Sequence, residues 1–264
     1  MPARNADHAE NTHLVLIPSY NTGEKLFETV ADARSHWLPV WVVIDGSTDG
    51  TGEALAALSA NQRGVRVIRR SRNGGKGAAV LDGIRAAATA GFTHVLVMDA
   101  DGQHPASMIP AFMQLSQRNP QAMILGTPVF DHNAPRIRVI GRRVSNALAR
   151  LETLSGIGDV LFGFRVYPLA ALRTIMESSR WMRRFDFDTE AVVRLSWRGV
   201  PAINQPVPVR YFRAADGGVS HFRYVRDNIA LAAMHLRLIG GFLPRLPWLV
   251  ARLLNRSSSK SFHH

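Results

Sequence analysis

The sequence predicts an α/β protein whose mainly parallel sheet is covered by helices on both sides. Short apolar runs alternate with segments of helical spacing, which is the pattern of βαβ units. The runs are continuous, as expected for strands buried on both faces. The chain has 264 residues, of which 46% are hydrophobic and 20% charged, so it can form a full core and leaves little room for disorder.

In the first half of the chain the expected elements follow one another regularly. The predicted strands are His13–Ile17, Val40–Ile44, Val65–Ile68, Val95–Met98 and Met123–Gly126. The predicted helices are one with Leu26, Val30 and Ala33 on one face, then 53–58, 78–90, and one around Phe112 and Leu115.

After Asp131 the pattern changes. A helix is expected within 135–154, and its apolar stripe at helical spacing predicts core packing. The stripe consists of Val144, Ala147, Leu148, Leu151 and Leu154. A later helix passes through Val193 and Trp197 and ends at Gly199. The segment Val207–Phe212 predicts an edge strand because prolines flank and interrupt its start.

Composition narrows the class of protein. With no cysteine, disulfides and thiolate metal sites are excluded. The polar segment Met1–His13 does not resemble a secretory signal, and no uninterrupted apolar run approaches the ~20 residues of a membrane span, so we expect a cytoplasmic protein. The net charge of +12 predicts an anionic partner. Nucleic acid is not expected, because the basic clusters lack interleaved aromatic residues.

Two carboxylates stand at the end of the fourth predicted strand. Asp99 and Asp101 are two residues apart, so in an extended segment they point the same way and can share a cation. Gln103 can add an amide oxygen, and such hard donors suit Mg²⁺ or Mn²⁺. The alternative is that the two aspartates only cap a helix that opens at His104 or Pro105.

Polar loops follow the other parallel strands at the same edge of the sheet. They contain Tyr20-Asn21, Asp45 to Ser47, and the glycine-rich basic loop Asn73 to Lys76. Ligands bind at this edge in open α/β sheets. The alternative for Asp45 and Ser47 is that they form turns and bind no ligand. The alternative for Lys76 is that it is an ordinary exposed lysine. The Walker and dinucleotide-binding glycine patterns are absent from the sequence.

A third group of carboxylates comes later. Asp186, Asp188 and Glu190 lie close to Arg183 and Arg184, which makes them candidates for a general base beside an anion site, with Glu190 preferred. The alternative is that Asp186 or Asp188 caps the following helix, with Glu190 in its first turn.

The ordered motifs resemble family 2 glycosyltransferases of GT-A fold, in particular polyprenyl-phosphate (dolichyl-phosphate) mannosyl- and glucosyltransferases. The resemblance covers 14–222. The matching motifs are Ile17-Pro18-Ser19-Tyr20-Asn21, Asp45-Gly46-Ser47-Thr48-Asp49-Gly50-Thr51, Asn73-Gly74-Gly75-Lys76-Gly77, Met98-Asp99-Ala100-Asp101-Gly102-Gln103-His104-Pro105, Gly163-Phe164-Arg165 and Ser220-His221-Phe222. Ile44 stands where the family usually has an additional aspartate, and Ser220-His221 where it often has Ser-Lys.

The resemblance implies a role for each motif. The donor, a nucleoside-diphosphate sugar, would be held by Pro18, Tyr20, Asn21, Asp45, Ser47, Lys76 and Asp99. The metal on its diphosphate would be held by Asp99, Asp101 and Gln103. Glu190, with Asp188 and Asp186 as further candidates, and the segment Gly218–Phe222 would face the acceptor, which is expected to be a lipid. The resemblance also implies inversion at the anomeric carbon.

These expectations divide the chain into a flexible N-terminus (1–12), a GT-A domain (13–222) and a basic amphipathic tail (223–264). From His221 onward the tail has seven Lys or Arg and one acidic residue, Asp227. Its interrupted apolar segment 242–254, with Trp248, predicts peripheral association with the anionic inner face of the membrane. Two other classes are a noncatalytic basic binding module and a nucleotidyltransferase, the latter disfavoured because its glycine-rich loop should follow the first strand.

Overall fold

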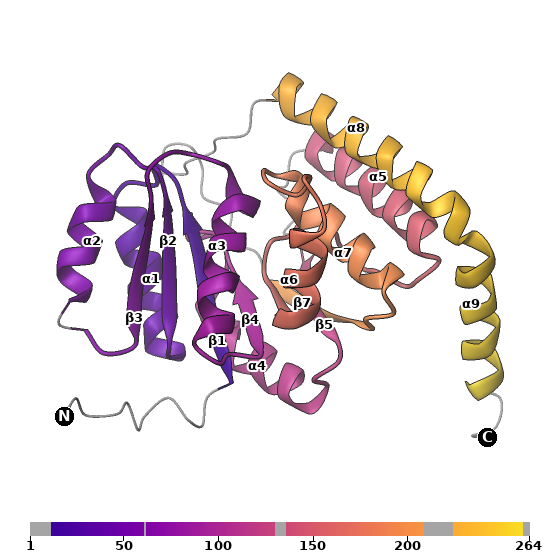
Figure 1. Ribbon diagram of the computed structural model, residues 1–264, viewed down its shortest axis with the longest axis horizontal. Coiled ribbons are helices and arrows are strands. Elements are labelled where there is room, and N and C mark those ends of the chain that lie inside the picture. Colours follow the sequence, from indigo (N-terminus) through magenta and orange to yellow (C-terminus); the bar gives the residue numbers. More distant parts are fainter. Residues whose placement is uncertain (1–11, 61, 130–135, 209–223, 261–264) are drawn as a thin grey trace.

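A seven-stranded sheet forms the centre of the computed structural model, which describes residues 12–60, 62–129, 136–208 and 224–260 (Figure 1). The side chains of 136–140, 224–228 and 255–260 are outside this description. So are most of the expected flexible N-terminus and the whole Gly218–Phe222 segment. The strand order is β3-β2-β1-β4-β6-β5-β7.

The elements agree with the predicted alternation, and the strands are mostly parallel. The strands are β1 (His13–Ser19), β2 (Val40–Asp45), β3 (Val65–Arg70), β4 (His94–Val97), β5 (Met123–Val129), β6 (Arg165–Pro168) and β7 (Ala202–Pro208). The helices are α1 (Lys25–His36), α2 (Thr51–Ser59), α3 (Lys76–Thr89), α4 (Ile109–Arg118), α5 (Arg136–Thr153), α6 (Leu169–Glu177), α7 (Asp186–Trp197), α8 (Tyr224–Phe242) and α9 (Leu246–Lys260), with 3-10 turns η2 (Ala106–Met108) and η4 (Leu243–Arg245).

Alternate residues of each strand enter the cores on the two sides of the sheet, as the two-residue period of a strand requires. In β1, Leu14 and Leu16 pack with α3, α6 and α7, whereas Val15 and Ile17 pack with α1 and α4. All four are fully buried, which accounts for the unbroken apolar run in the sequence.

One strand reverses the sheet. β6 runs antiparallel to both neighbours and places Arg165 opposite Val97, immediately before the Asp99 loop. No strand was predicted for this segment, of which only the motif Gly163-Phe164-Arg165 was identified. β7 is an edge strand, as predicted, but it begins at Ala202, before the predicted start at Val207, because it pairs with β5 along Met123–Val129. The rest of the predicted strand, 209–212, lies outside the described residues.

The apolar stripe of α5 packs in the core only in part: Leu154 lies against the core and Leu148 is half-buried. Val144 and Leu151 are more than half exposed, whereas Ser145, Glu152 and Thr153 are buried. The inward face is polar because it has polar partners: the Trp197 indole donates to the Glu152 carbonyl at 2.7 Å, and His235 Nδ1 lies 2.8 Å from Glu152 Oε1. Helical spacing shows that a face is apolar, not which way it points.

The C-terminal helices lie along the outside of the domain, with α8 beside α5 (Figure 1). Met234, Leu238, Phe242 and Leu249 are buried against the domain, while the opposite face is exposed. Among the described residues, Ile229–Leu254 is long and apolar enough to cross a membrane, which the sequence analysis did not expect. The structure joins α8 and α9 through η4, so the prolines do not separate them widely.

Candidate active site

The loops after β1 and β2 form one wall of the site. The Asn21 amide nitrogen donates to Ser47 Oγ at 3.0 Å, and the Thr48 nitrogen donates to Asn21 Oδ1 at 2.8 Å. Asn21 adopts a left-handed conformation, with φ of 45°, that a short polar side chain tolerates. Tyr20 is partly buried in the same loop, and Pro18 is buried within β1. These predicted donor residues therefore lie together.

Asp45 organises the glycine-rich loop. Its carboxylate is buried and accepts hydrogen bonds from the Gly74 nitrogen at 3.0 Å, from the Gly75 nitrogen at 2.7 Å and from the Arg70 guanidinium. The side chain is thus engaged by the protein itself. This arrangement fixes the loop that leads into Lys76, the first residue of α3.

Lys76 joins two of the predicted carboxylates. Its Nζ lies 2.6 Å from Asp99 Oδ1 and donates to both oxygens of Asp188, at 2.7 and 2.9 Å. Burial opposes the charge of this amine, but the attraction of Asp188 and Asp99 outweighs it and raises the pKa of Lys76. Lys76 is therefore a buried ammonium ion and not the exposed lysine of the alternative interpretation.

The strand-end carboxylates have unequal environments. Burial and the neighbouring charge of Asp99 raise the pKa of Asp101 to about 6. Burial acts on Asp99 in the same sense, but the attraction of Lys76 reverses it and lowers the pKa of Asp99. The Gln103 nitrogen donates to Asp101 Oδ1 at 3.0 Å. Asp101 is thus the carboxylate whose charged form is disfavoured, and a divalent cation bound beside it would stabilise that form.

Neither aspartate caps the following helix. The turn η2 and helix α4 begin at Ala106 and Ile109, and neither has a side-chain cap. The described residues contain no group of three His, Cys, Asp or Glu that could hold a metal. A metal here would accordingly be bound by Asp99, Asp101 and Gln103 together with water or substrate oxygens.

His104 supports Asp99 and was not identified from the sequence as a site residue. Its Nδ1 accepts from the Asp99 nitrogen at 3.0 Å, and its Nε2 lies 3.7 Å from Asp99 Oδ2. The ring packs edge-on against Phe162 and Phe164. Burial lowers the pKa of His104 to about 4, so the ring is neutral and carries its proton on Nε2. The signal in the sequence was its place directly after the Asp-Gly-Gln turn.

β6 and the segment just before it supply two further residues that were quoted only as part of a motif, Arg165 and Gly163. Arg165 is fully buried and donates through Nη1 to the Tyr167 hydroxyl at 3.1 Å and to the Asp188 carbonyl. Gly163 leaves space for the ion pair: a Cβ there would lie 2.6 Å from Lys76 Nζ and 2.9 Å from Asp99 Oδ2. The reversed strand thus forms the floor of the site.

The three carboxylates of α7 point to different partners. Asp186 accepts from the nitrogens of Met182 and Arg184, at 3.0 and 2.9 Å, as a residue at a helix start does. Glu190 is fully buried; its Oε1 accepts from Arg194 at 2.7 Å and its Oε2 from Arg237 at 3.1 Å. Only Asp188 of the three contacts Lys76. The structure therefore gathers Lys76, Asp99 and Asp188, and leaves Glu190 in a separate ion-pair network.

The chain is similar in sequence to two curated sugar transferases. A polyprenol monophosphomannose synthase of Mycolicibacterium smegmatis is 29% identical over 194 residues, covering 71% of each chain. An undecaprenyl-phosphate mannosyltransferase of Micrococcus luteus is 26% identical over 206 residues, covering 74% of this chain and 82% of its own.

The solved structures show the same fold. Glucosyl-3-phosphoglycerate synthase from Mycobacterium tuberculosis, crystallised with Mn²⁺, UDP and glucosyl-3-phosphoglycerate, superposes with a TM-score of 0.62. Its identity is 21%, and the match covers 90% of this chain and 80% of that one. The sequence profile described as Glycosyl transferase family 2 matches residues 14–176, which is more than half of the chain. The protein is thus a glycosyltransferase that belongs to family 2, with a GT-A-type fold, and it is related to the polyprenyl-phosphate sugar transferases.

Proposed function

We propose that this enzyme transfers a sugar from a nucleoside-diphosphate sugar to a lipid-type acceptor, a polyprenyl phosphate or a hydroxylated lipid, with inversion at the anomeric carbon. The observation that carries the proposal is the cluster of Lys76, Asp99 and Asp101 at the carboxyl edge of the parallel strands. A cation and an anionic diphosphate both find opposite charges there.

The donor would occupy the wall formed by the first two loops. Tyr20, Asn21 and Ser47 lie together there, and the glycine-rich loop held by Asp45 leads to Lys76. A nucleotide and a divalent cation are also the ligands named for the structural relative crystallised with UDP and Mn²⁺, which supports the proposed ligand class. Asp99, Asp101 and Gln103 would hold Mg²⁺ or Mn²⁺, which when bound neutralises the charge that develops on the leaving diphosphate.

The acceptor would enter on the side of α7. A lipid phosphate is already ionised and needs no general base, whereas a lipid hydroxyl does. Of the three α7 carboxylates, we favour Asp188 for the position nearest the reaction, because it touches the Lys76 ammonium. The ion pairs of Glu190 with Arg194 and Arg237 suit a residue that holds α7 against α8, so we assign Glu190 an indirect contribution to the acceptor side.

The enzyme would meet its acceptor at the membrane surface, on the cytoplasmic side. The outward side of α8, η4 and α9 bears large exposed apolar residues, and we call it the tail face. It consists of Ile229, Leu236, Leu243, Leu246, Trp248, Val250, Leu253 and Leu254. The inward side is fastened to the domain by Arg237 and by Arg252, which donates to the Ser196 carbonyl at 2.7 Å.

This attachment favours a helix lying along the membrane surface over one crossing it, because a spanning segment could not keep its buried contacts with the domain. The exposed α5 residues Val144 and Leu151 add to the apolar surface beside α8. Each of Arg245 and Arg252 is partly engaged by the protein, since Arg245 donates to the Gly241 carbonyl at 2.6 Å and Arg252 to the Ser196 carbonyl.

The proposal is tested by incubating the protein with a panel of UDP- and GDP-sugars and a membrane lipid extract in Mn²⁺, then measuring lipid masses. A lipid phosphate or lipid alcohol heavier by one sugar is expected with wild type and not with Asp101→Asn. If the enzyme transfers sugar only to water-soluble phosphates in the same extract, the lipid acceptor is wrong. A protein that binds neither nucleotide in the presence of metal would overturn the proposed donor.

A further inference from the structure

We propose that the Lys76 ammonium neutralises Asp99 when no donor is bound, in place of a divalent cation. When the donor binds, its diphosphate would attract Lys76 away from Asp99. A divalent cation and the nucleotide would therefore bind together, and the cation alone would bind weakly. This inference rests on the proposed metal role of Asp99 and Asp101.

The contacts of Lys76 define the resting arrangement. Its side chain is only 10% exposed, and its Nζ contacts Asp99 Oδ1 and both Asp188 oxygens. On the far side, Asp99 Oδ2 faces His104 Nε2 at 3.7 Å. The carboxylate that should be a principal metal ligand is thus already neutralised by a side chain of the protein.

A divalent cation cannot join this arrangement without cost. A Mg²⁺ or Mn²⁺ ligand distance is about 2 Å, so a cation on Asp99 would stand within roughly 5 Å of the Lys76 ammonium. Two like charges at that separation in a partly buried site repel each other strongly. The Lys76 ammonium cannot move toward Gly163 to avoid the cation, because Lys76 and Asp99 already fill the space that a Cβ at this position would need.

The Lys76 ammonium has an alternative position, beside the glycine-rich loop. Lys76 is the first residue of α3, directly after the glycine-rich loop, and a flexible four-carbon stem carries its ammonium. A diphosphate beside this loop would offer it anionic oxygens. Asp188 would keep its two hydrogen bonds to the amine as it leaves Asp99, so the ammonium would never be buried without a partner.

Binding of Mn²⁺ to the protein, followed by the electron paramagnetic resonance signal of free Mn²⁺, tests the inference without any transfer reaction. Lys76→Met should bind Mn²⁺ in the absence of nucleotide about tenfold more tightly than wild type, which is within the usual range of coupling between sites. Asp188→Asn should bind it more weakly, because Lys76 is then left to Asp99 alone. General damage to the site would weaken binding in both variants.

Arg142→Met is the control for a nearby charge that is paired with another carboxylate, since Arg142 Nη1 lies 2.9 Å from Asp159 Oδ2. It should change nucleotide-free Mn²⁺ affinity less than about threefold, as screening reduces charge effects beyond direct contact. UDP should raise Mn²⁺ affinity more in wild type than in Lys76→Met.

The outcomes separate the two proposals. If wild type binds Mn²⁺ with UDP but Lys76→Met without UDP binds no more tightly than wild type, the role of Lys76 is overturned and the metal site stands. If wild type binds no Mn²⁺ even with UDP, both are overturned. Should Lys76→Met not fold, as judged by its thermal transition, Asp188→Asn decides: unchanged or tighter Mn²⁺ binding in that variant rejects the inference.

Discussion

His104 accepts a hydrogen bond from the backbone nitrogen of Asp99 and turns its other ring nitrogen toward the Asp99 carboxylate. A single imidazole thereby holds the main chain of the predicted metal ligand and faces its carboxylate. His104→Ala is expected to lower transfer about tenfold or more, as loss of a supporting partner does at metal sites. His104→Asn, whose side-chain oxygen can accept from the same nitrogen, should retain more activity. Equal transfer by wild type and His104→Ala would contradict this role.

Removing the charge of Asp101 should abolish function without harming the fold. Asp101→Asn is expected to lower transfer by at least about a hundredfold, because a charge that stabilises the transition state is lost. Its melting temperature should equal or exceed that of wild type, since burial and Asp99 already disfavour the Asp101 charge. Asp99→Asn should also lose transfer. Near-normal turnover of Asp101→Asn at saturating metal would remove this residue from the mechanism.

Glu190→Gln should affect stability and turnover more than nucleotide binding. The substitution leaves Arg194 and Arg237 without their buried carboxylate, and breaking a buried pair costs about 3 kcal/mol or more. The rate constant kcat should fall because α7 also carries Asp188, while the Kd for the nucleotide should stay within about threefold, since the nucleotide lies across the site. Calorimetry and steady-state kinetics measure both. Loss of nucleotide affinity with intact kcat would reverse the assignment.

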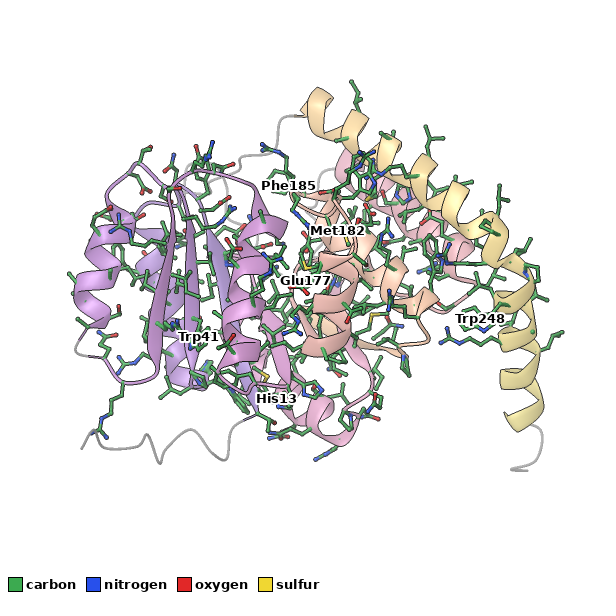
Figure 2. The ribbon with its side chains drawn as sticks, in the orientation of Figure 1. His13, Trp41, Glu177, Met182, Phe185 and Trp248 are labelled. Atoms are coloured by element: carbon green, nitrogen blue, oxygen red, sulfur yellow. The ribbon has the colours of Figure 1, made fainter. Side chains whose placement is uncertain are left out.

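Acid should destabilise the protein because it protonates His13, which lies at the end of the sheet opposite the site (Figure 2). His13 stacks on His94 at 4.3 Å, and burial together with His94 lowers the pKa of His13 to about 4. The folded state therefore binds fewer protons than the unfolded state, and this contribution to stability is lost as pH falls from about 6.5 toward 4.

Urea denaturation at pH 7 and pH 4.5 measures this effect. His13→Gln should lose less of its free energy of unfolding than wild type over that interval, with the difference amounting to at most about 3 kcal/mol. His94, whose pKa burial also lowers, remains in the variant and contributes in the same direction. An identical loss in the two proteins would show that His13 does not carry the effect.

Association with anionic vesicles should depend on the tail face. Trp248 is 48% exposed on α9 (Figure 2), and Trp248→Glu with Leu253→Glu should prevent flotation with vesicles, because charged groups do not enter the acyl boundary. Truncation after Gly241 should do the same, and flotation of wild type should weaken as salt rises. Leu58→Glu, an equally exposed change on α2 at the other end of the molecule, is the control. Flotation of the double variant with the efficiency of wild type would reject the membrane proposal.

The strand-end carboxylates and the polar loops of the site could be predicted from the sequence around each of them. Asp99 and Asp101 follow a run of buried residues, and the polar loops follow strands that are parallel neighbours, so their convergence follows from strand direction alone. The choice between Asp188 and Glu190 could not be made this way. Both lie on α7, and which one faces the site is decided by Arg237, a residue of α8 that is 47 positions further along the chain.

Two other features depend on long-range packing. The direction of the α5 stripe is set by Trp197 and His235, which satisfy polar groups on its inward face. β6 was not predicted from the sequence because it has only four residues and follows a glycine-rich stretch. It forms a strand by pairing with β4 on one side and β5 on the other. In each case the partners are far away in sequence, where periodicity carries no information.

The bridge from Lys76 to Asp188 also bears on how the enzyme loses activity on heating. It closes a chain segment of 112 residues and rests on β6, which itself needs both neighbours in place. Closing so long a loop has a large entropic cost, so a partly folded chain would have little tendency to hold the two side chains together. Transfer activity should consequently disappear in the same cooperative transition as the sheet.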